Sequence, residues 1–139
     1  MTDITSLKTV LVANRGEIAL RAIRTCRELN IRTIGIYSAP DSVSPHAWLA
    51  DRSVCIGPAS AENSYLCAES LIHIAKETNC DGIYPGYGFL AENAKFAELC
   101  EENNITMLLV THDLELAKRL PQQIVMADGQ IVEDTLESI

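Results

Sequence analysis

Short continuous apolar runs alternate along the chain with stretches in which apolar residues recur at helical spacing. The first run covers residues 9–13, and in residues 17–30 apolar side chains from Ile18 to Leu29 share one helical face. A second apolar run follows at residues 32–37. Continuous apolar runs are typical of strands buried on both faces, so this pattern predicts a strand–helix–strand unit with a right-handed crossover.

The same alternation continues to the end of the chain. Asp113 precedes the last helical stretch as a candidate N-cap, and Asp128-Gly129 separates two short apolar runs, which predicts a hairpin turn with positive φ. The predicted fold class is therefore α/β, with a three-layer, Rossmann-like and mostly parallel sheet and a C-terminal antiparallel hairpin. The further elements we expect are strands at residues 54–57, 82–84, 106–110, 123–126 and 130–132, helices at 46–51, 63–78, 91–103 and 114–120, and a loop at 38–45.

Length and composition suit one globular domain over residues 1–139, with 47% apolar and 22% charged residues. Nine basic and thirteen acidic residues precede residue 107, and two basic and six acidic residues follow it, so each part carries a net charge of −4. No basic stripe is present to release counterions, so we expect no nucleic acid and no anionic membrane as a partner.

Targeting and metal-binding patterns are not found in the sequence. No apolar run approaches the roughly 20 residues needed to span a bilayer, and residues 1–8 lack the charged-then-apolar pattern of a signal peptide. The five cysteines include no CxxC pair. We therefore expect a cytoplasmic protein with free thiols and no metal site.

Four runs in the first part of the chain resemble one family. They read ANRGEIA at 13–19, CIGP at 55–58, SYL at 64–66 and PGYGFLAEN at 85–93. In this order they resemble the N-terminal domain of biotin carboxylases, the ATP-dependent ligase module of acetyl-CoA, propionyl-CoA and pyruvate carboxylases. The likeness covers about residues 8–106, with one departure at Tyr84, where the family usually has a histidine.

The last part of the chain resembles a different family. The runs MLLVTHDL at 107–114, LAKR at 116–119 and MADGQIV at 126–132 are similar to the C-terminal segment of ABC-transporter ATPases, nearest to the lipoprotein-releasing type. The likeness covers about residues 107–134. Both families have a buried strand at the junction, so our interpretation is a chimera in which parts 1–106 and 107–139 form one domain, made by engineering or by natural recombination.

The candidate ligand groups are few. Phosphate-binding loops have the sequence pattern GxxxxGK[ST], and dinucleotide-binding loops have the pattern GxGxxG. Neither pattern occurs in this sequence. The turn Asn14-Arg15-Gly16 could hold an anion through backbone N–H groups at a helix start, or it could be only a tight strand-to-helix turn. The resemblance implies that Arg21 and Tyr87 match positions near the biotin and bicarbonate pocket.

The two resemblances imply three further positions. Arg24 and Glu28 match carboxylase positions used in dimerisation, although a solvated charged helix face with Glu17–Arg21 and Arg24–Glu28 pairs is the alternative. His112 matches the ABC-ATPase histidine that contacts the terminal phosphate of ATP. That contact requires a phosphate loop and a magnesium-binding carboxylate, and this sequence contains neither.

These observations predict a folded chain that is not an enzyme and carries no cofactor. The ATP-grasp domain that binds ATP in biotin carboxylases is absent from these residues. Two alternatives remain open: a module with weak residual binding of ATP, phosphate or biotin, and an interaction domain that forms a weak homodimer through its first helix. We also expect the C-terminal hairpin to be the loosest part, because its apolar residues lack their usual partners.

Overall fold

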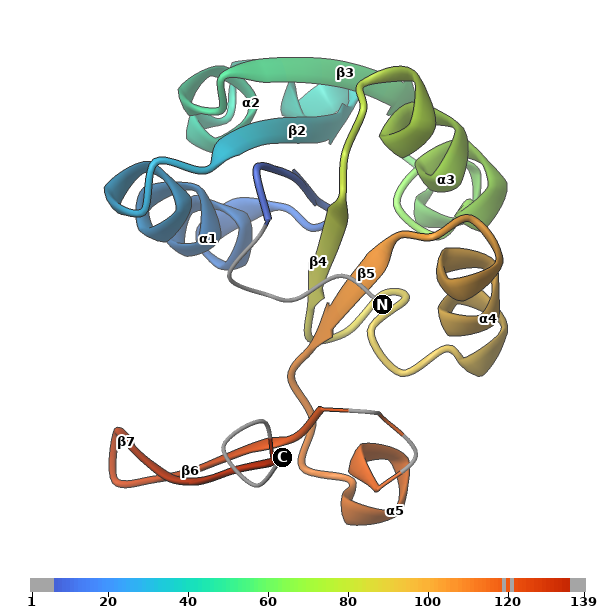
Figure 1. Cartoon of the computed structure of the whole chain (residues 1–139). Coiled ribbons are helices and arrows are strands. Elements are labelled where there is room, and N and C mark those ends of the chain that lie inside the picture. Colours follow the sequence, from blue (N-terminus) through green and yellow to red (C-terminus); the bar gives the residue numbers. More distant parts are fainter. Residues whose placement is uncertain (1–6, 119, 121, 136–139) are drawn as a thin grey trace.

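The computed structural model of the chain describes residues 7–118, 120 and 122–135. Its main feature is a five-stranded, all-parallel sheet of order β3-β2-β1-β4-β5, and β6 and β7 form a separate antiparallel pair (Figure 1). The elements are β1 (Thr9–Val12), α1 (Gly16–Glu28), β2 (Arg32–Ser38), the 3-10 turn η2 (Ala39–Val43), α2 (Pro45–Leu49), β3 (Arg52–Gly57), the 3-10 turn η3 (Ala61–Asn63), α3 (Ala68–Glu77), β4 (Gly82–Gly86), α4 (Ala94–Glu102), β5 (Thr106–Leu109), α5 (Leu114–Ala117), β6 (Ile124–Ala127) and β7 (Gln130–Asp134).

Helices cover both faces of the large sheet. In Figure 1, α1 and α2 lie on one side of the strands and α3 and α4 lie on the other. Neighbouring residues of β1 pack on opposite faces of the sheet. Val12 packs with Ala19 and Ile23 of α1. Leu11 belongs to the larger hydrophobic cluster, which includes Phe96 of α4. Because successive side chains of a strand alternate, a strand covered on both faces needs a continuous apolar run. The predicted three-layer α/β class is confirmed.

Some helix boundaries differ from the predicted ones for local reasons. The spacing placed Leu29 on the inner face of the first helix, but α1 ends at Glu28 and Leu29 is 63% exposed. The helix expected from residue 91 starts at Ala94, because the Asn93 side chain accepts a 3.0 Å hydrogen bond from the N–H of Phe96 and caps α4. The helix expected from residue 63 is preceded by η3 and starts only at Ala68.

The C-terminal part forms the predicted helix and hairpin beyond the carboxyl end of β5. Oδ1 of Asp113 accepts hydrogen bonds from the N–H groups of Glu115 and Leu116, which confirms the N-cap. Asp128 and Gly129 have φ values of 51° and 75°, as a tight two-residue turn requires. The helix α5 is shorter than expected, and residues 119 and 121 lie outside the described part. In Figure 1 the hairpin projects away from the large sheet.

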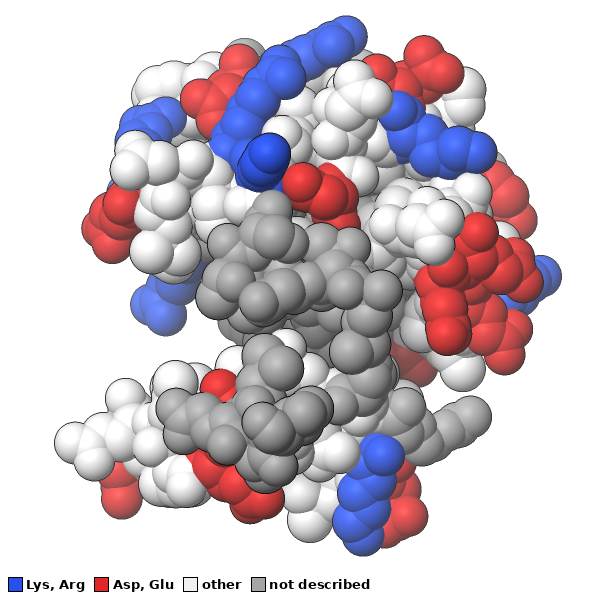
Figure 2. Space-filling view, viewed as in Figure 1, with Lys and Arg blue, Asp and Glu red and all other residues white. Residues whose placement is uncertain are grey.

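The surface in Figure 2 mixes both charge signs, with acidic side chains grouped at the right and basic ones scattered across the upper part. Within the described residues, none of the helices is long and apolar enough to cross a membrane.

Candidate functional site at the carboxyl edge of the sheet

Asn14 links two loops at the carboxyl edge of the sheet. The residue follows β1 and is buried. Its Nδ2 donates to the carbonyl oxygens of Pro85 at 2.7 Å and Tyr87 at 3.0 Å, and its Oδ1 accepts from the N–H of Arg15 at 2.8 Å. The strands β1 and β4 are neighbours here, and the chain order of the sheet reverses between them. Open α/β sheets place ligands in this position, and here the Asn14 side chain spans it.

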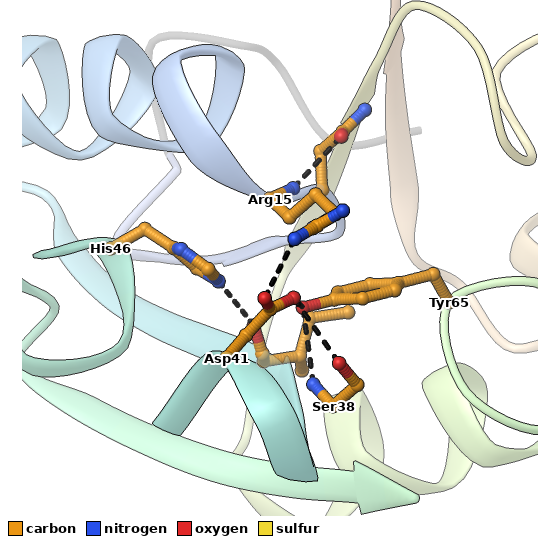
Figure 3. Close-up of polar contacts among 7 residues, drawn as sticks. Arg15, Ser38, Asp41, His46 and Tyr65 are labelled. Atoms are coloured by element: carbon orange, nitrogen blue, oxygen red, sulfur yellow. Dashed lines mark hydrogen bonds and ion pairs between the residues drawn. The ribbon is translucent and has the colours of Figure 1, made fainter. Parts of the chain in front are cut away.

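A second polar cluster surrounds the buried carboxylate of Asp41 (Figure 3). Nη2 of Arg15 donates to Oδ1 at 2.6 Å, while the hydroxyls of Tyr65 and Ser38 donate to Oδ2 at 2.7 Å and 3.1 Å. The N–H of Ser38 in turn donates to the Tyr65 oxygen at 3.1 Å. We call these four residues, Arg15, Ser38, Asp41 and Tyr65, the Asp41 cluster. It joins the start of α1, the end of β2, η2 and the segment before α3.

The hydrogen bonds of the Asp41 cluster determine its charge state. Burial by itself would raise the pKa of Asp41, but the hydrogen bonds from Tyr65, Arg15 and Ser38 outweigh it and hold that pKa below its ordinary value. Burial, reinforced by the hydrogen bond to Asp41, raises the pKa of Tyr65 to about 12. The same carboxylate raises the pKa of Arg15 through its hydrogen bond. At neutral pH the cluster is therefore an ion pair with a protonated phenol.

A small pocket of about 260 Å³ opens beside the cluster. Its wall combines the Asp41 cluster with apolar side chains, and the rings of Tyr65 and Phe89 stack with centroids 5.1 Å apart. Phe89 belongs to the same loop as Tyr87, so the cluster and Asn14 hold this loop from two sides. Because the carboxylate of Asp41 already accepts three side-chain donors, it is not available as an activated nucleophile.

His46 of α2 lies buried near the Asp41 cluster (Figure 3). Its Nε2 lies 3.1 Å from the carbonyl oxygen of Ile36, which assigns the proton to Nε2, and its buried Nδ1 has no hydrogen-bond partner. Burial lowers the pKa of His46, and the hydrogen bond to Ile36 offsets this in part. His46 is thus a neutral structural side chain.

The residues of the predicted anion turn are already bonded to other parts of the chain. Asn14 and the Arg15 guanidinium take part in the contacts above, and Gly16 begins α1 with a φ of 59°. Tyr87 lies in the adjoining loop with its side chain 63% exposed. The structure therefore brings Asn14, Arg15 and Tyr87 to one edge of the sheet.

The other predicted residues lie elsewhere. Arg21 is exposed on α1 and pairs with Glu17 at 3.2 Å, as expected. Arg24 and Glu28 are exposed on the same helix, but the predicted ion pair between them is not formed. His112 is exposed in the loop between β5 and α5. Among the described residues, no group of three or more histidine, cysteine or acidic side chains could hold a metal ion.

Sequence reasoning did not identify Asp41, Tyr65 or His46 as partners. Asp41 lies in the segment expected to be a loop, and its partners Arg15 and Tyr65 are 26 and 24 positions away. The one available signal was that Tyr65 falls within the family-like run at 64–66. Pattern alone cannot pair residues that only the sheet topology brings together.

The parallel sheet with a polar cluster at its carboxyl edge defines a Rossmann-like α/β domain. Within that class, the chain belongs to the biotin carboxylase N-terminal domain family, whose model matches residues 6–110. Biotin carboxylase 1 of Bacillus subtilis is 44% identical over 144 aligned residues, covering 96% of this chain and 32% of that protein. Biotin carboxylase of Pseudomonas aeruginosa is 53% identical over 102 residues, 73% of this chain and 23% of that protein.

Solved structures agree with this assignment. The urea amidolyase of K. lactis matches with a TM-score of 0.71 and 44% identity, over 73% of this chain and 6% of that one. The biotin carboxylase domain dimer of Hydrogenobacter thermophilus 2-oxoglutarate carboxylase, solved with MgADP, ADP and bicarbonate, matches with a TM-score of 0.70 and 50% identity over 73% and 22%.

These matches cover only part of each related protein. The chain spans about a quarter to a third of the two bacterial carboxylases. The family match ends at residue 110, one position beyond β5, although the alignment with the Bacillus protein extends into the tail. None of these comparisons supports the likeness of residues 107–134 to ABC ATPases, which stays a hypothesis.

Proposed function

We propose that these residues form a folded carboxylase lobe that has no catalytic activity by itself and no bound cofactor. The observation that carries this proposal is the saturation of the Asp41 cluster. The carboxylate of Asp41 accepts Arg15, Ser38 and Tyr65, so the charged groups at the carboxyl edge are used to fix loops. The match to an N-terminal domain alone is consistent with such a structural role.

The test is an assay of the purified chain with Mg-ATP, bicarbonate and free biotin, which measures phosphate release and carboxybiotin. We expect no turnover above the buffer blank, while Biotin carboxylase 1 of Bacillus subtilis assayed in parallel supplies the positive control. Turnover that copurifies with the chain and is lost in Tyr87→Ala or His112→Ala would overturn the proposal.

Weak residual binding of ATP, phosphate or biotin is a second candidate, favoured by the 260 Å³ pocket beside Arg15. Isothermal titration with each of the three molecules tests it. Saturable heat that disappears in both Arg15→Ala and Tyr87→Ala would support binding at this edge. Heat that persists in both variants would place any binding elsewhere.

A weak homodimer through α1 is a third candidate. Arg24, Glu28 and Leu29 are exposed on or next to that helix, and the related Hydrogenobacter thermophilus domain was solved as a dimer. Sedimentation of Arg24→Glu tests it, because reversing this charge should weaken the dimer. An unchanged mass distribution would exclude α1 as the contact.

A cytoplasmic location, proposed from the free cysteines, is tested by cell fractionation.

For the tail we propose an origin in an ABC ATPase, joined to the carboxylase part near residue 106. The histidine-containing run at 107–114, the end of the family match at residue 110 and the separate hairpin support this origin. Grafting residues 107–135 in place of the corresponding segment of a lipoprotein-releasing ATPase tests it. Retained ATPase activity that is lost on His112→Ala would support it, whereas an inactive but folded graft would contradict it.

A further inference from the structure

The dipeptide Asp-Gly occurs twice in the sequence, as Asp81-Gly82 and as Asp128-Gly129. An aspartyl residue followed by glycine can close into a cyclic imide, because glycine has no Cβ to hinder the approach of its main-chain nitrogen to the aspartyl carboxyl group. Ring closure needs a carboxyl group that is free and a main chain that can rotate. The fold gives the two dipeptides opposite surroundings, so two sites that are identical in sequence differ in their chemistry.

Asp81-Gly82 is fixed by the large sheet. The N–H groups of Lys8 and Thr9 donate to the Asp81 carboxylate at 3.1 Å and 2.9 Å. The main chain of Asp81 is bonded as well, since its N–H donates to the carbonyl oxygen of Thr9 and its own carbonyl oxygen accepts from Thr106, each at 3.0 Å. Gly82 is buried in β4, which pairs with β1 on one side and with β5 on the other. Rotation of this dipeptide therefore requires unfolding of the sheet.

Asp128-Gly129 forms the exposed turn between β6 and β7. Within the described part of the chain, the Asp128 carboxylate makes no hydrogen bond or ion pair, and a Cβ on Gly129 would have nothing within 4 Å. The hairpin is a sheet of only two strands, which is marginally stable in water, so its turn opens far more often than the large sheet. Figure 1 shows this turn at the free end of the projecting hairpin.

We propose that Asp128 is a site of spontaneous isoaspartate formation and that the fold protects Asp81 from the same reaction. The main-chain nitrogen of Gly129 attacks Cγ of Asp128, a C–N bond forms, and the carboxyl hydroxyl leaves with the amide proton as one water molecule. A water molecule then opens the imide ring. Cleavage of the new C–N bond restores aspartate, whereas cleavage of the original peptide bond leaves Gly129 linked through the side chain of Asp128.

The modification changes the geometry of the hairpin, because isoaspartate adds one carbon atom to the main chain at the turn. A two-residue turn matches the twist and the register of its flanking strands, which here pair Ala127 with Gln130. The additional atom disturbs this match, so we expect the modification to weaken the pairing of β6 with β7. The large sheet should stay intact, since its strands do not pair with the hairpin.

The test follows both dipeptides in one sample of the full chain, stored at neutral pH and physiological temperature. Trypsin leaves Asp81 in the peptide 77–95 and Asp128 in the peptide 120–139. Isoaspartate and aspartate have the same mass, so chromatography separates the isomeric peptides and electron-transfer fragmentation locates the modified residue. We expect isoaspartate to accumulate at Asp128 at least about tenfold faster than at Asp81, because opening free energies range from about zero at exposed turns to the global value in core strands.

The matched control for the fold is the same chain in guanidinium chloride, where both dipeptides are free and should react at similar rates. The control for the residue is Asp128→Glu, because a glutamyl side chain would have to close a less favourable six-membered ring. Isoaspartate in the peptide 120–139 should fall to background in this variant, and circular dichroism establishes that it is folded.

Four results would overturn the proposal. In the folded chain these are a reaction at Asp81 that is as fast as at Asp128, or no isoaspartate at Asp128 by the time the unfolded chain has reacted. A rate difference that persists in guanidinium chloride would show that the fold is not its cause. An undiminished isoaspartate signal from the peptide 120–139 of Asp128→Glu would assign the reaction to another residue.

Discussion

The phenolic hydroxyl of Tyr65 donates a 2.7 Å hydrogen bond to Oδ2 of Asp41, 24 positions away in the chain. The same oxygen of Tyr65 accepts the N–H of Ser38 at the end of β2, and its ring stacks on Phe89. One side chain thus connects the end of β2, the turn η2 and the loop after β4. This relationship holds three segments of the carboxyl edge of the sheet in place.

Replacing Tyr65 with Phe should lower the free energy of unfolding by about 1–3 kcal/mol, because the change leaves the buried Ser38 N–H without its acceptor and removes one donor from Asp41. The ring and its stacking on Phe89 are retained. Urea unfolding followed by circular dichroism measures the change. Tyr87→Phe, which removes an exposed hydroxyl, is the control and should stay within about 0.5 kcal/mol. Equal effects in both variants would contradict the role assigned to Tyr65.

The stability of the fold should fall as the pH drops below about 6.5, the ordinary pKa of histidine. Burial lowers the pKa of His46 in the folded state, so between the two pKa values the unfolded chain binds a proton that the folded chain does not. The stabilising contribution is complete above the unfolded pKa and is lost as the pH falls through the folded one. Urea unfolding over a pH series measures this dependence.

His46→Gln should remove this part of the pH dependence, whereas His112→Gln, which alters an exposed imidazole, should keep it. If His46→Gln does not fold, an NMR titration of the wild type replaces it. The ring signal of His46 should then titrate below its ordinary pKa of 6.5. A His46 that titrates at or above that value would refute the prediction.

Two neighbouring glycines should respond differently to substitution by alanine. Gly86 has a φ of 69°, and a Cβ there would lie 2.6 Å from Cγ2 of Ile18 and 3.3 Å from Nδ2 of Asn14. Gly88 has a similar φ of 74° but nothing within 4 Å of its Cβ position. Gly88→Ala should cost only the backbone strain of about 1–2 kcal/mol, and Gly86→Ala clearly more, because Ile18 and Asn14 must move. Equal unfolding free energies would show that the Asn14 contact is unimportant.

Truncation after residue 110 tests the prediction of one domain over all 139 residues. The hairpin forms its own sheet and its apolar side chains remain exposed, so the truncated chain should fold with nearly the unfolding midpoint of the full chain. A truncated chain that is unfolded, or whose midpoint falls strongly at equal monomer concentration, would show instead that the tail belongs to one cooperative unit.

Local patterns were sufficient for much of the fold. The continuous apolar run of β1 predicted a strand buried on both faces, because Leu11 and Val12 must each meet a helix layer. The Asp128-Gly129 pair predicted the hairpin turn, because its positive φ values depend only on those residues. The family-like runs of the first part predicted the family that the comparisons show over residues 6–110.

Other features depended on contacts distant in sequence. The charge state of Asp41 follows from its burial and from donors on two other segments, and the exposed state of β6 follows from where the chain goes after β5. The sequence by itself determined the strands, helices and turns, since these depend on side-chain spacing and local backbone preference. Only the tertiary structure decided which side chains meet at the carboxyl edge and which strand edges remain open, because both depend on the order in which the strands pair.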